Sequence, residues 1–231
     1  MKAFLLAAGN GTRLRPLTER TPKCLLPIGG VPLLSIWLEL CRRHGIEEVL
    51  INVHAHPGAI REYVTSNQNG MRVKLFEEST LLGSAGTVAA NREWVSGERL
   101  FWILYADVLT NINLRALLDF HVARETAATL AVYRVPDPSR CGVVAIGQNG
   151  VVREFVEKPL SPSSNLAFSG VLIGTRQLLD AIPSCRPADI GFDVLPRLVG
   201  NISAYEISDY LLDVGTIQNY KQAQATWPGL S

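Results

Sequence analysis

The sequence predicts an α/β fold in which helices on both faces cover a mixed, mainly parallel sheet. Short apolar runs alternate with amphipathic segments through residues 1–128, and this alternation is typical of parallel βαβ units. From residue 129 onward, several apolar runs follow one another with mostly turns between them, which indicates added hairpin strands. No internal repeat or long linker separates these parts. We therefore expect a single domain over 1–231.

Strands and helices alternate through the first half of the chain. Apolar runs predict strands at 2–8, 47–53, 72–78 and 100–107. Periodic apolar positions predict helices between them at 32–45, 58–68, 84–95 and 113–124. In the first helix Leu33, Trp37 and Leu40 share one face, while Arg42 and Arg43 suit the negative end of the helix dipole.

The second half of the chain contains more strands and shorter helices. Strands are expected at 129–135, 142–147, 151–157, 168–174, 202–208 and 210–215. Helices are expected at 176–182, 193–199 and 216–227. The Gln-Asn-Gly segment at 148–150 is a hairpin signal, because Asn-Gly favours the tight turn that joins two antiparallel strands.

Composition excludes several classes of protein. The formal net charge is +1, which argues against a general nucleic-acid-binding surface. The four cysteines lack metal-ligand spacing, so reduced thiols in a cytoplasmic protein are the simplest interpretation. The apolar start is too short for a signal peptide, and no apolar run is long enough to span a membrane. We therefore expect neither nucleic acid nor membrane as a partner.

A glycine-rich loop with nearby cations follows the first predicted strand. Gly9 and Gly11 let backbone N–H groups approach an anion closely, and Arg13 adds a planar, permanently charged fork. Leu14 stands where the dinucleotide fingerprint needs its third glycine, and the Gly-Lys-Ser/Thr of a P-loop is absent. The loop and Lys23 could together bind a triphosphate; the alternative is a solvated basic loop.

These residues resemble the signature of the sugar-1-phosphate nucleotidylyltransferases. The family pattern L-A-G-G-x-G-T-R-L-x-P-L-T, followed by P-K-x-L-x-P-I, is similar to Leu-Ala-Ala-Gly-Asn-Gly-Thr-Arg-Leu-Arg-Pro-Leu-Thr at 6–18 and Pro-Lys-Cys-Leu-Leu-Pro-Ile at 22–28. Further segments resemble the family in the same order, at 81–88, 105–109, 140–144, 155–159, 168–174 and 211–216.

The resemblance implies a Rossmann-like fold of the nucleotide-diphospho-sugar transferase type. It implies a nucleotide-binding half at 1–128 and a sugar-phosphate-binding half at 129–231. In the reaction, a nucleoside triphosphate and a sugar 1-phosphate give a nucleotide-sugar and pyrophosphate. The sequence looks closest to mannose-1-phosphate and heptose-1-phosphate guanylyltransferases, which favours GTP and a mannose- or heptose-type substrate. The resemblance allows for a homo-oligomer.

The motif matches imply roles for individual residues. Arg13, Lys23 and Asp107 would be catalytic, with the two cations acting on the phosphates. Asp107 and Asp213 each end an apolar run, and the resemblance places a Mg²⁺ ion on this pair. The predicted substrate-binding residues are Gly9, Gly11, Thr12, Glu78, Gly83, Gly86, Gly142, Glu157, Lys158 and Ser169.

The choice of base and sugar depends on fewer residues. Glu78 is an acceptor that could read the N1–H and N2–H donors of guanine; the alternative is a solvent-facing glutamate at a strand end. Cys141, Phe168 and Ser169 depart from the usual family residues on the presumed sugar side. UTP or dTTP with a glucose-type phosphate is the alternative substrate pair. A non-catalytic nucleotide-sugar-binding homologue is disfavoured, because the predicted catalytic cations and carboxylates are all present.

Overall fold

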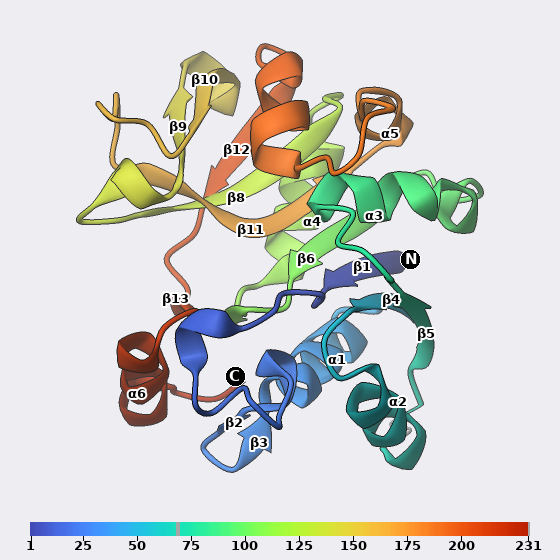
Figure 1. Ribbon diagram of the computed structural model, residues 1–231. Coiled ribbons are helices and arrows are strands. Elements are labelled where there is room, and N and C mark those ends of the chain that lie inside the picture. The colour runs from blue at the N-terminus through green and yellow to red at the C-terminus, as the bar shows by residue number, and fades with distance from the viewer. Residues whose placement is uncertain (68–69, 231) are drawn as a thin grey trace. The chain divides into compact units, whose positions relative to one another are not determined.

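The computed structural model describes residues 1–67 and 70–230, which form two compact units (Figure 1). Unit 1 comprises 1–81, 104–112 and 209–231, and unit 2 comprises 82–103 and 113–208. Each unit is therefore assembled from separate stretches of the chain. The predicted division into a nucleotide-binding half at 1–128 and a sugar-phosphate-binding half at 129–231 stays a prediction.

Unit 1 contains strands in the order β6-β1-β4-β5. Both the β1–β4 and the β4–β5 pairs are parallel. The strands of this sheet are β1 (Lys2–Leu6), β4 (Glu48–Val53), β5 (Arg72–Glu77) and the end of β6 (Phe101–Tyr105). The helices are α1 (Leu33–Arg43), α2 (Pro57–Ser66) and α6 (Ile217–Thr226). Two short antiparallel pairs are β2 (Pro27–Ile28) with β3 (Val31–Pro32), and β7 (Val108–Thr110) with β13 (Leu211–Asp213).

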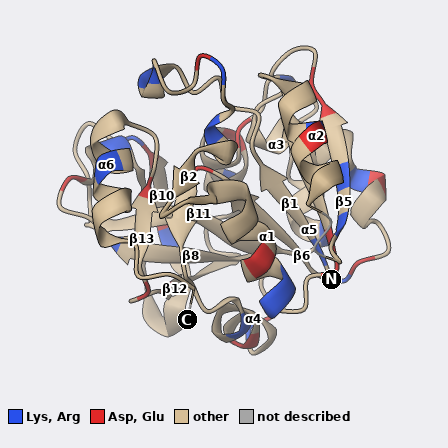
Figure 2. Cartoon of the chain, turned by 90° about the horizontal axis from the view of Figure 1, so that it is seen from below, with Lys and Arg blue, Asp and Glu red and all other residues tan. Residues whose placement is uncertain are grey.

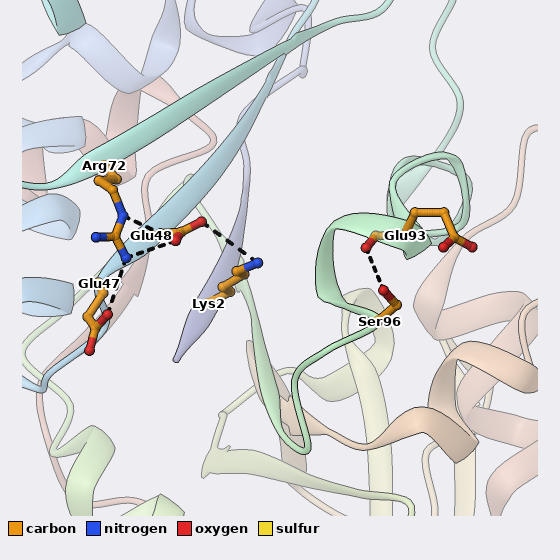
Figure 3. A network of polar contacts seen from close by, with 6 residues as sticks. All are labelled: Lys2, Glu47, Glu48, Arg72, Glu93 and Ser96. Atoms are coloured by element: carbon orange, nitrogen blue, oxygen red, sulfur yellow. Dashed lines mark hydrogen bonds and ion pairs between the residues drawn. The ribbon is translucent and has the colours of Figure 1, made fainter.

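A line of charges crosses the starts of the three parallel strands (Figure 3). The strand register places Lys2 beside Glu48 and Glu48 beside Arg72. Lys2 Nζ lies 3.8 Å from Glu48, and the Arg72 guanidinium contacts Glu48 at 2.8 Å and Glu47 at 3.2 Å. Because the Arg72 and Glu47 side chains are exposed, the ion pair between them contributes little to stability. The charges nevertheless match the register, since opposite charges on neighbouring strands are favourable.

Helix α1 packs its predicted apolar face into the core of unit 1. Leu33, Trp37 and Leu40 are almost fully buried, and the Trp37 indole N–H donates to the Val108 carbonyl at 2.8 Å. Acidic and basic residues follow one another on the other face of the helix (Figure 2). On that face, hydrogen bonds from Arg42 and Arg43 lower the pKa of Glu39 to about 2.

Unit 2 combines antiparallel and parallel strand pairs. Its strands are β8 (Ala128–Arg134), β9 (Gly142–Ile146), β10 (Val152–Glu157), β11 (Leu166–Gly174), β12 (Ile202–Glu206) and the start of β6. The order is β10-β9-β11-β6, and β8 pairs with β11 and β12. The β8–β12 pair is parallel, whereas β10–β9 and β11–β8 are antiparallel. The helices are α3 (Ser84–Ala90), α4 (Leu114–Val122) and α5 (Arg176–Asp180).

The predicted fold class, a mixed sheet with helices, is confirmed, and the differences lie in short elements. The helix predicted at 84–95 ends at Ala90, because the Asn91 side chain donates back to the Thr87 carbonyl. A 3₁₀ turn follows at Arg92–Val95. The helix predicted at 193–199 starts earlier, as a π-helical turn at Ile190–Val194.

The Gln-Asn-Gly hairpin signal is confirmed, because it joins the antiparallel strands β9 and β10. Strands β2, β3 and β7 were not predicted; they have only two or three residues each. The predicted helix at 58–68 corresponds to α2, and Gln68 lies outside the described residues. Within 1–67 and 70–230, no helix combines the length and apolar character needed to cross a membrane.

Candidate active site

The glycine-rich loop after β1 presents bare backbone to the solvent. It contains the predicted substrate-binding residues Gly9, Gly11 and Thr12, and Gly11 adopts a φ of +63° that favours glycine. Thr18 Oγ1 donates to the Gly11 carbonyl at 2.7 Å and holds the turn. Within the described part of the chain, the N–H groups of residues 9–11 donate no hydrogen bond. They are therefore available to an anion.

Lys23 and Asp107 form an ion pair beside this loop. Lys23 begins a 3₁₀ turn and Asp107 follows β6. The Lys23 Nζ lies 2.9 Å from Asp107 Oδ2. The Lys23 side chain is only 11 % exposed, whereas that of Asp107 is 41 % exposed. The carboxylate thus faces the solvent while the lysine stem packs against the protein.

Asp213 lies on the strand next to Asp107. In the β7–β13 pair Asp213 is opposite Val108, and the Val214 N–H donates to the Asp107 carbonyl at 2.9 Å. Burial raises the pKa of Asp213, and the negative charge of Asp107 raises it further, while Lys23 and Arg13 oppose this shift. Unit 1 therefore brings together all four predicted catalytic and metal-binding side chains: Arg13, Lys23, Asp107 and Asp213.

Gly215 belongs to this cluster, and the sequence reasoning missed it. A Cβ atom at Gly215 would lie 2.7 Å from Asp213 Oδ1 and 2.9 Å from Arg13 Nη2. Both separations are shorter than real Cβ contacts. The absence of a side chain at 215 therefore lets Arg13 and Asp213 approach the same place. The Asp-Val-Gly-Thr segment at 213–216 carried a signal for this residue.

Asp107 and Asp213 fit the metal that the resemblance implies. Two carboxylates close enough to raise the pKa of one of them provide the oxygen donors that Mg²⁺ prefers. Among the described residues, no group of three or more His, Cys, Asp and Glu side chains could hold a metal ion. A divalent ion at this pair would therefore need oxygen ligands from substrate or water, as is usual for Mg²⁺.

Asn52 connects Glu78 to the end of β1, a link that sequence reasoning also missed. Asn52 is buried; its Oδ1 accepts from the Ala7 N–H at 2.6 Å, and its Nδ2 donates to Glu78 Oε1 at 2.8 Å. Glu78 is only 6 % exposed, so it is not a solvent-facing glutamate. One carboxylate oxygen of Glu78 is committed to Asn52. The lone polar residue within the apolar run at 49–53 was the available signal.

His54 and His56 belong to the structure around Glu78 and α2. The His54 Nδ1 lies 2.7 Å from the Glu78 carbonyl oxygen, so this nitrogen carries the proton and donates. His56 precedes α2 with a φ of +53°. His54 thus binds the backbone of Glu78, and His56 is the residue before α2.

In unit 2, Glu157 ends β10 beside two glycines, and Lys158 follows it. Glu157 pairs with Gly142 across the β9–β10 ladder. A Cβ atom added at Gly142 would lie 2.7 Å from Glu157 Oε2, and a Cβ atom added at Gly191 would lie 2.4 Å from the same oxygen. Burial raises the pKa of Glu157, the charge of Lys158 lowers it, and that of Asp189 raises it. The carboxylate is thus held in a tight space that a side chain at either glycine would fill.

Lys158 extends from this site toward an exposed aromatic ring. It adopts a φ of +51°, and its Nζ lies 3.8 Å from Glu157 Oε1. The same Nζ lies 5.5 Å from the centre of the Phe192 ring, within cation–π range. Phe192 is 56 % exposed, although phenylalanine is usually buried. Sequence reasoning missed Phe192, because no pattern marks an exposed aromatic in a short irregular segment.

Gly83 and Gly86 allow α3 to pack closely on another segment of unit 2. A Cβ at Gly83 would lie 2.2 Å from the Ala188 carbonyl oxygen, and the Gly86 N–H donates to that same oxygen at 3.1 Å. Ser169 is buried in β11, where its Oγ accepts from the Val171 N–H. These contacts give Gly83, Gly86 and Ser169 structural roles within unit 2. Their predicted roles toward substrate stay predictions.

Comparisons with known proteins identify the family of the chain. The Nucleotidyl transferase family model matches residues 2–228. The chain is 32 % identical over 244 residues to the UTP–glucose-1-phosphate uridylyltransferase of Synechocystis, covering 96 % of this chain and 62 % of that protein. It is 30 % identical over 228 residues to the mannose-1-phosphate guanylyltransferase of Mycobacterium tuberculosis, covering 96 % and 63 %. The chain thus spans less than two thirds of the length of these relatives.

A solved structure with the same fold is HddC from Yersinia pseudotuberculosis complexed with GMP-PN. It superimposes with a TM-score of 0.81 at 21 % identity, covering 97 % of this chain and 98 % of that one. The family match extends over nearly the whole chain and includes every predicted site residue. The chain therefore belongs to the nucleotidyl transferase family, with relatives among the sugar-1-phosphate nucleotidylyltransferases.

Proposed function

We propose that this protein transfers a nucleoside monophosphate from a nucleoside triphosphate to a sugar 1-phosphate. The observation that carries the proposal is the convergence of Arg13, Lys23, Asp107 and Asp213 next to a loop with unbonded N–H groups. Two substrates that both carry phosphate repel each other, so a site for their reaction needs cations. The relatives named above support this class of reaction.

In the proposed reaction an oxygen of the sugar phosphate attacks the α-phosphorus of the triphosphate. A new oxygen–phosphorus bond forms, and the bond from the α-phosphorus to the bridging oxygen breaks, releasing pyrophosphate. The loop N–H groups and Arg13 would hold the triphosphate and stabilise charge on its oxygens. Lys23 would leave Asp107 and contact phosphate. These residues position two anions, and no covalent bond to the protein is needed.

Asp107 and Asp213 would hold Mg²⁺, which supplies positive charge at the phosphates when bound. The Lys23–Asp107 ion pair shows that this carboxylate already attracts a cation. Arg13 lowers the pKa of Asp213, against the larger effects of burial and of Asp107. It thereby helps to keep this ligand ionised.

For the sugar phosphate we propose Lys158 as the phosphate contact and Glu157 as an acceptor for a sugar hydroxyl. The exposed ring of Phe192 lies beside Lys158. Its electron-rich face would suit the C–H groups of a sugar ring. Gly142 and Gly191 would act as positioning residues, because they leave the space that the Glu157 carboxylate fills.

For the base we propose GTP, and for the sugar a mannose- or heptose-type phosphate. Glu78 supports guanine as a buried acceptor, although Asn52 occupies one of its oxygens. The relatives include both a guanylyltransferase and a uridylyltransferase, so UTP or dTTP with a glucose-type phosphate is the alternative. A cytoplasmic location is expected from the sequence, and the family resemblance allows for a homo-oligomer.

The test is pyrophosphate release with Mg²⁺, each of five triphosphates and a panel of sugar 1-phosphates. GTP with mannose 1-phosphate or a heptose 1-phosphate is expected to react fastest. Phe192→Ala should raise KM for the sugar phosphate and leave KM for the triphosphate unchanged. Val31→Ala is the control, because Val31 is an exposed apolar residue on β3 that belongs to none of the proposed sites. Binding of a nucleotide-sugar without turnover of any pair would instead indicate a non-catalytic homologue.

A further inference from the structure

A pocket in unit 2 contains none of the predicted site residues. Its volume is about 460 Å³, which is within the range of small-ligand sites. Three segments of the chain line the pocket. They are residues 98–100 before β6, residues from 121 to 126 at the end of α4 and just after it, and residues 175–177 at the start of α5. Thr175 directly follows β11, whereas the predicted substrate residue Ser169 lies six residues earlier. At about 3.3 Å per residue the two are roughly 20 Å apart.

Three arginines line this pocket. The guanidinium of Arg124 is held in place, because it lies 3.5 Å from the centre of the Phe120 ring and donates to the carbonyls of Asn149 and Phe120. Arg176 contacts Asp180 only at 3.8 Å, and both side chains are exposed. Arg99 forms no ion pair with any residue in 1–67 or 70–230. Part of the positive charge is therefore not neutralised.

His121 directs a nitrogen into the same pocket. The residue is only 3 % exposed, and its Nδ1 lies 2.8 Å from Thr129 Oγ1. Its Nε2 forms no hydrogen bond within the described part of the chain. Every fully buried side-chain nitrogen or oxygen in that part has a partner. The Nε2 must therefore reach solvent, and the pocket that His121 lines is the space it faces.

The charges around His121 suit an anionic ligand. Burial lowers the pKa of His121, and the positive charge of Arg99 lowers it further. The imidazole is therefore mainly neutral near pH 7. If the Thr129 hydroxyl donates to Nδ1, then Nε2 carries the proton and is a donor toward the pocket. Arg99 and His121 would then present donors to the same ligand.

We propose that this pocket binds a small anion carrying a phosphate or pyrophosphate group. Arg99, Arg124 and His121 would donate hydrogen bonds to its oxygens, as arginine and imidazole do in phosphate sites. Glu98 and Glu125 also line the pocket. They limit the charge it can accept and offer acceptors to the hydroxyl groups of a phosphate ester. The inference does not depend on the proposed nucleotidyl transfer.

The test uses the imidazole NMR signals of the full chain. The protein has four histidines, so loss of one signal in His121→Gln assigns His121. The protein is titrated at constant ionic strength with inorganic phosphate, pyrophosphate and mannose 1-phosphate, with chloride as the control anion. A saturable shift of the His121 signal is expected with the phosphate compounds. Tighter binding of mannose 1-phosphate would assign the ester, and equal binding the phosphate group alone; both support the site.

Three variants test whether this signal reports on the pocket. Arg99→Gln should weaken the binding at least about tenfold, a difference of about 1.4 kcal/mol. Arg115→Gln is the matched control, because it removes an exposed arginine of α4 that does not line the pocket. Arg13→Gln should leave the His121 response unchanged, which separates this pocket from the proposed active site. The other imidazole signals report whether each variant is folded.

Three outcomes would overturn the proposal. The first is the absence of a saturable His121 shift with every phosphate compound. The second is unchanged affinity in Arg99→Gln. The third is loss of the response in Arg13→Gln, which would place the bound anion at the glycine-rich loop. Failure of the pyrophosphate-release assay would bear on the proposed transfer reaction and not on this binding site.

Discussion

The Nζ of Lys23 lies 2.9 Å from Asp107 Oδ2, although the two residues are 84 positions apart in the sequence. Each charge neutralises the other before any substrate binds. A triphosphate offers Lys23 a second anionic partner, and Mg²⁺ offers Asp107 a second cation. We therefore expect substrate binding to exchange the partners of both residues, so that little uncompensated charge is created at any stage.

Asp107→Asn should reduce pyrophosphate release by about two orders of magnitude, corresponding to roughly 3 kcal/mol. A neutral amide keeps the shape of the side chain but is a poor ligand for Mg²⁺ and leaves Lys23 without its counter-charge. Rates measured over a range of Mg²⁺ concentrations test this. Asp119→Asn is the control, because it removes an exposed, ion-paired carboxylate of α4. Activity within a few-fold of wild type at limiting Mg²⁺ would remove Asp107 from the site.

Gly215→Ala should reduce activity and leave stability nearly unchanged. The added methyl group would meet Asp213 Oδ1 at 2.7 Å and Arg13 Nη2 at 2.9 Å. Both are ends of flexible side chains, which can move away at low cost. A displacement of about 1 Å at a catalytic group can cost about a hundredfold in rate. The measurements are kcat and the urea midpoint.

Gly58→Ala provides the comparison for Gly215, since nothing lies within 4 Å of the Cβ position at Gly58. Gly58→Ala should change neither kcat nor the urea midpoint by much. Wild-type activity in Gly215→Ala would show that the close approach of Arg13 and Asp213 is not needed.

Glu78→Gln should reduce the preference for GTP over other triphosphates by roughly tenfold to a hundredfold, because an unmatched buried polar group costs about 1–3 kcal/mol. The amide oxygen can keep the hydrogen bond from Asn52, which places the NH₂ toward a guanine donor. Competition assays between GTP and UTP measure the change. Glu77→Gln is the control, because Glu77 is exposed and paired with Arg61.

Two results would contradict the guanine assignment. A wild-type preference for UTP, dTTP or ATP would exclude it directly. An equal loss with all triphosphates would instead show that Glu78 acts through Asn52, by holding the Ala7 N–H at the start of the glycine-rich loop.

Glu157→Gln should make the protein more stable at neutral pH and less active. Burial, followed by the charge of Asp189, raises the pKa of Glu157 in the folded state, against the opposite effect of Lys158. A carboxyl group with a raised folded pKa favours folding while it is protonated, and this contribution is lost as pH rises through the folded pKa. The ionised group is therefore a cost at pH 7, which glutamine avoids.

Urea unfolding at several pH values measures this effect. The stability gain of Glu157→Gln should shrink below the ordinary glutamate pKa of about 4.3, where both proteins are neutral at this position. Glu154→Gln on the same strand is the control, because Glu154 is exposed. A gain that does not vary with pH would assign the effect to packing and not to ionisation.

Local patterns were sufficient for the longer elements and for several candidate residues. The apolar runs predicted β1, β4 and β6 because a buried strand needs consecutive apolar residues. The loop at 9–12 could be predicted because glycine beside arginine is a local feature. The extent of α3 could not, because the Asn91 side chain competes with the helix at a position where the periodic pattern continues.

The sequence by itself determined the mixed α/β class, the glycine-rich loop and, through the family resemblance, the residue types of the candidate site. The tertiary structure alone decided which of these residues meet. The Lys23–Asp107 pair, the Asn52 bridge, the space at Gly215 and the exposed ring of Phe192 beside Lys158 all depend on contacts between distant segments. Such contacts are set by strand pairing and packing across the sheet, which the periodicity of one segment cannot report.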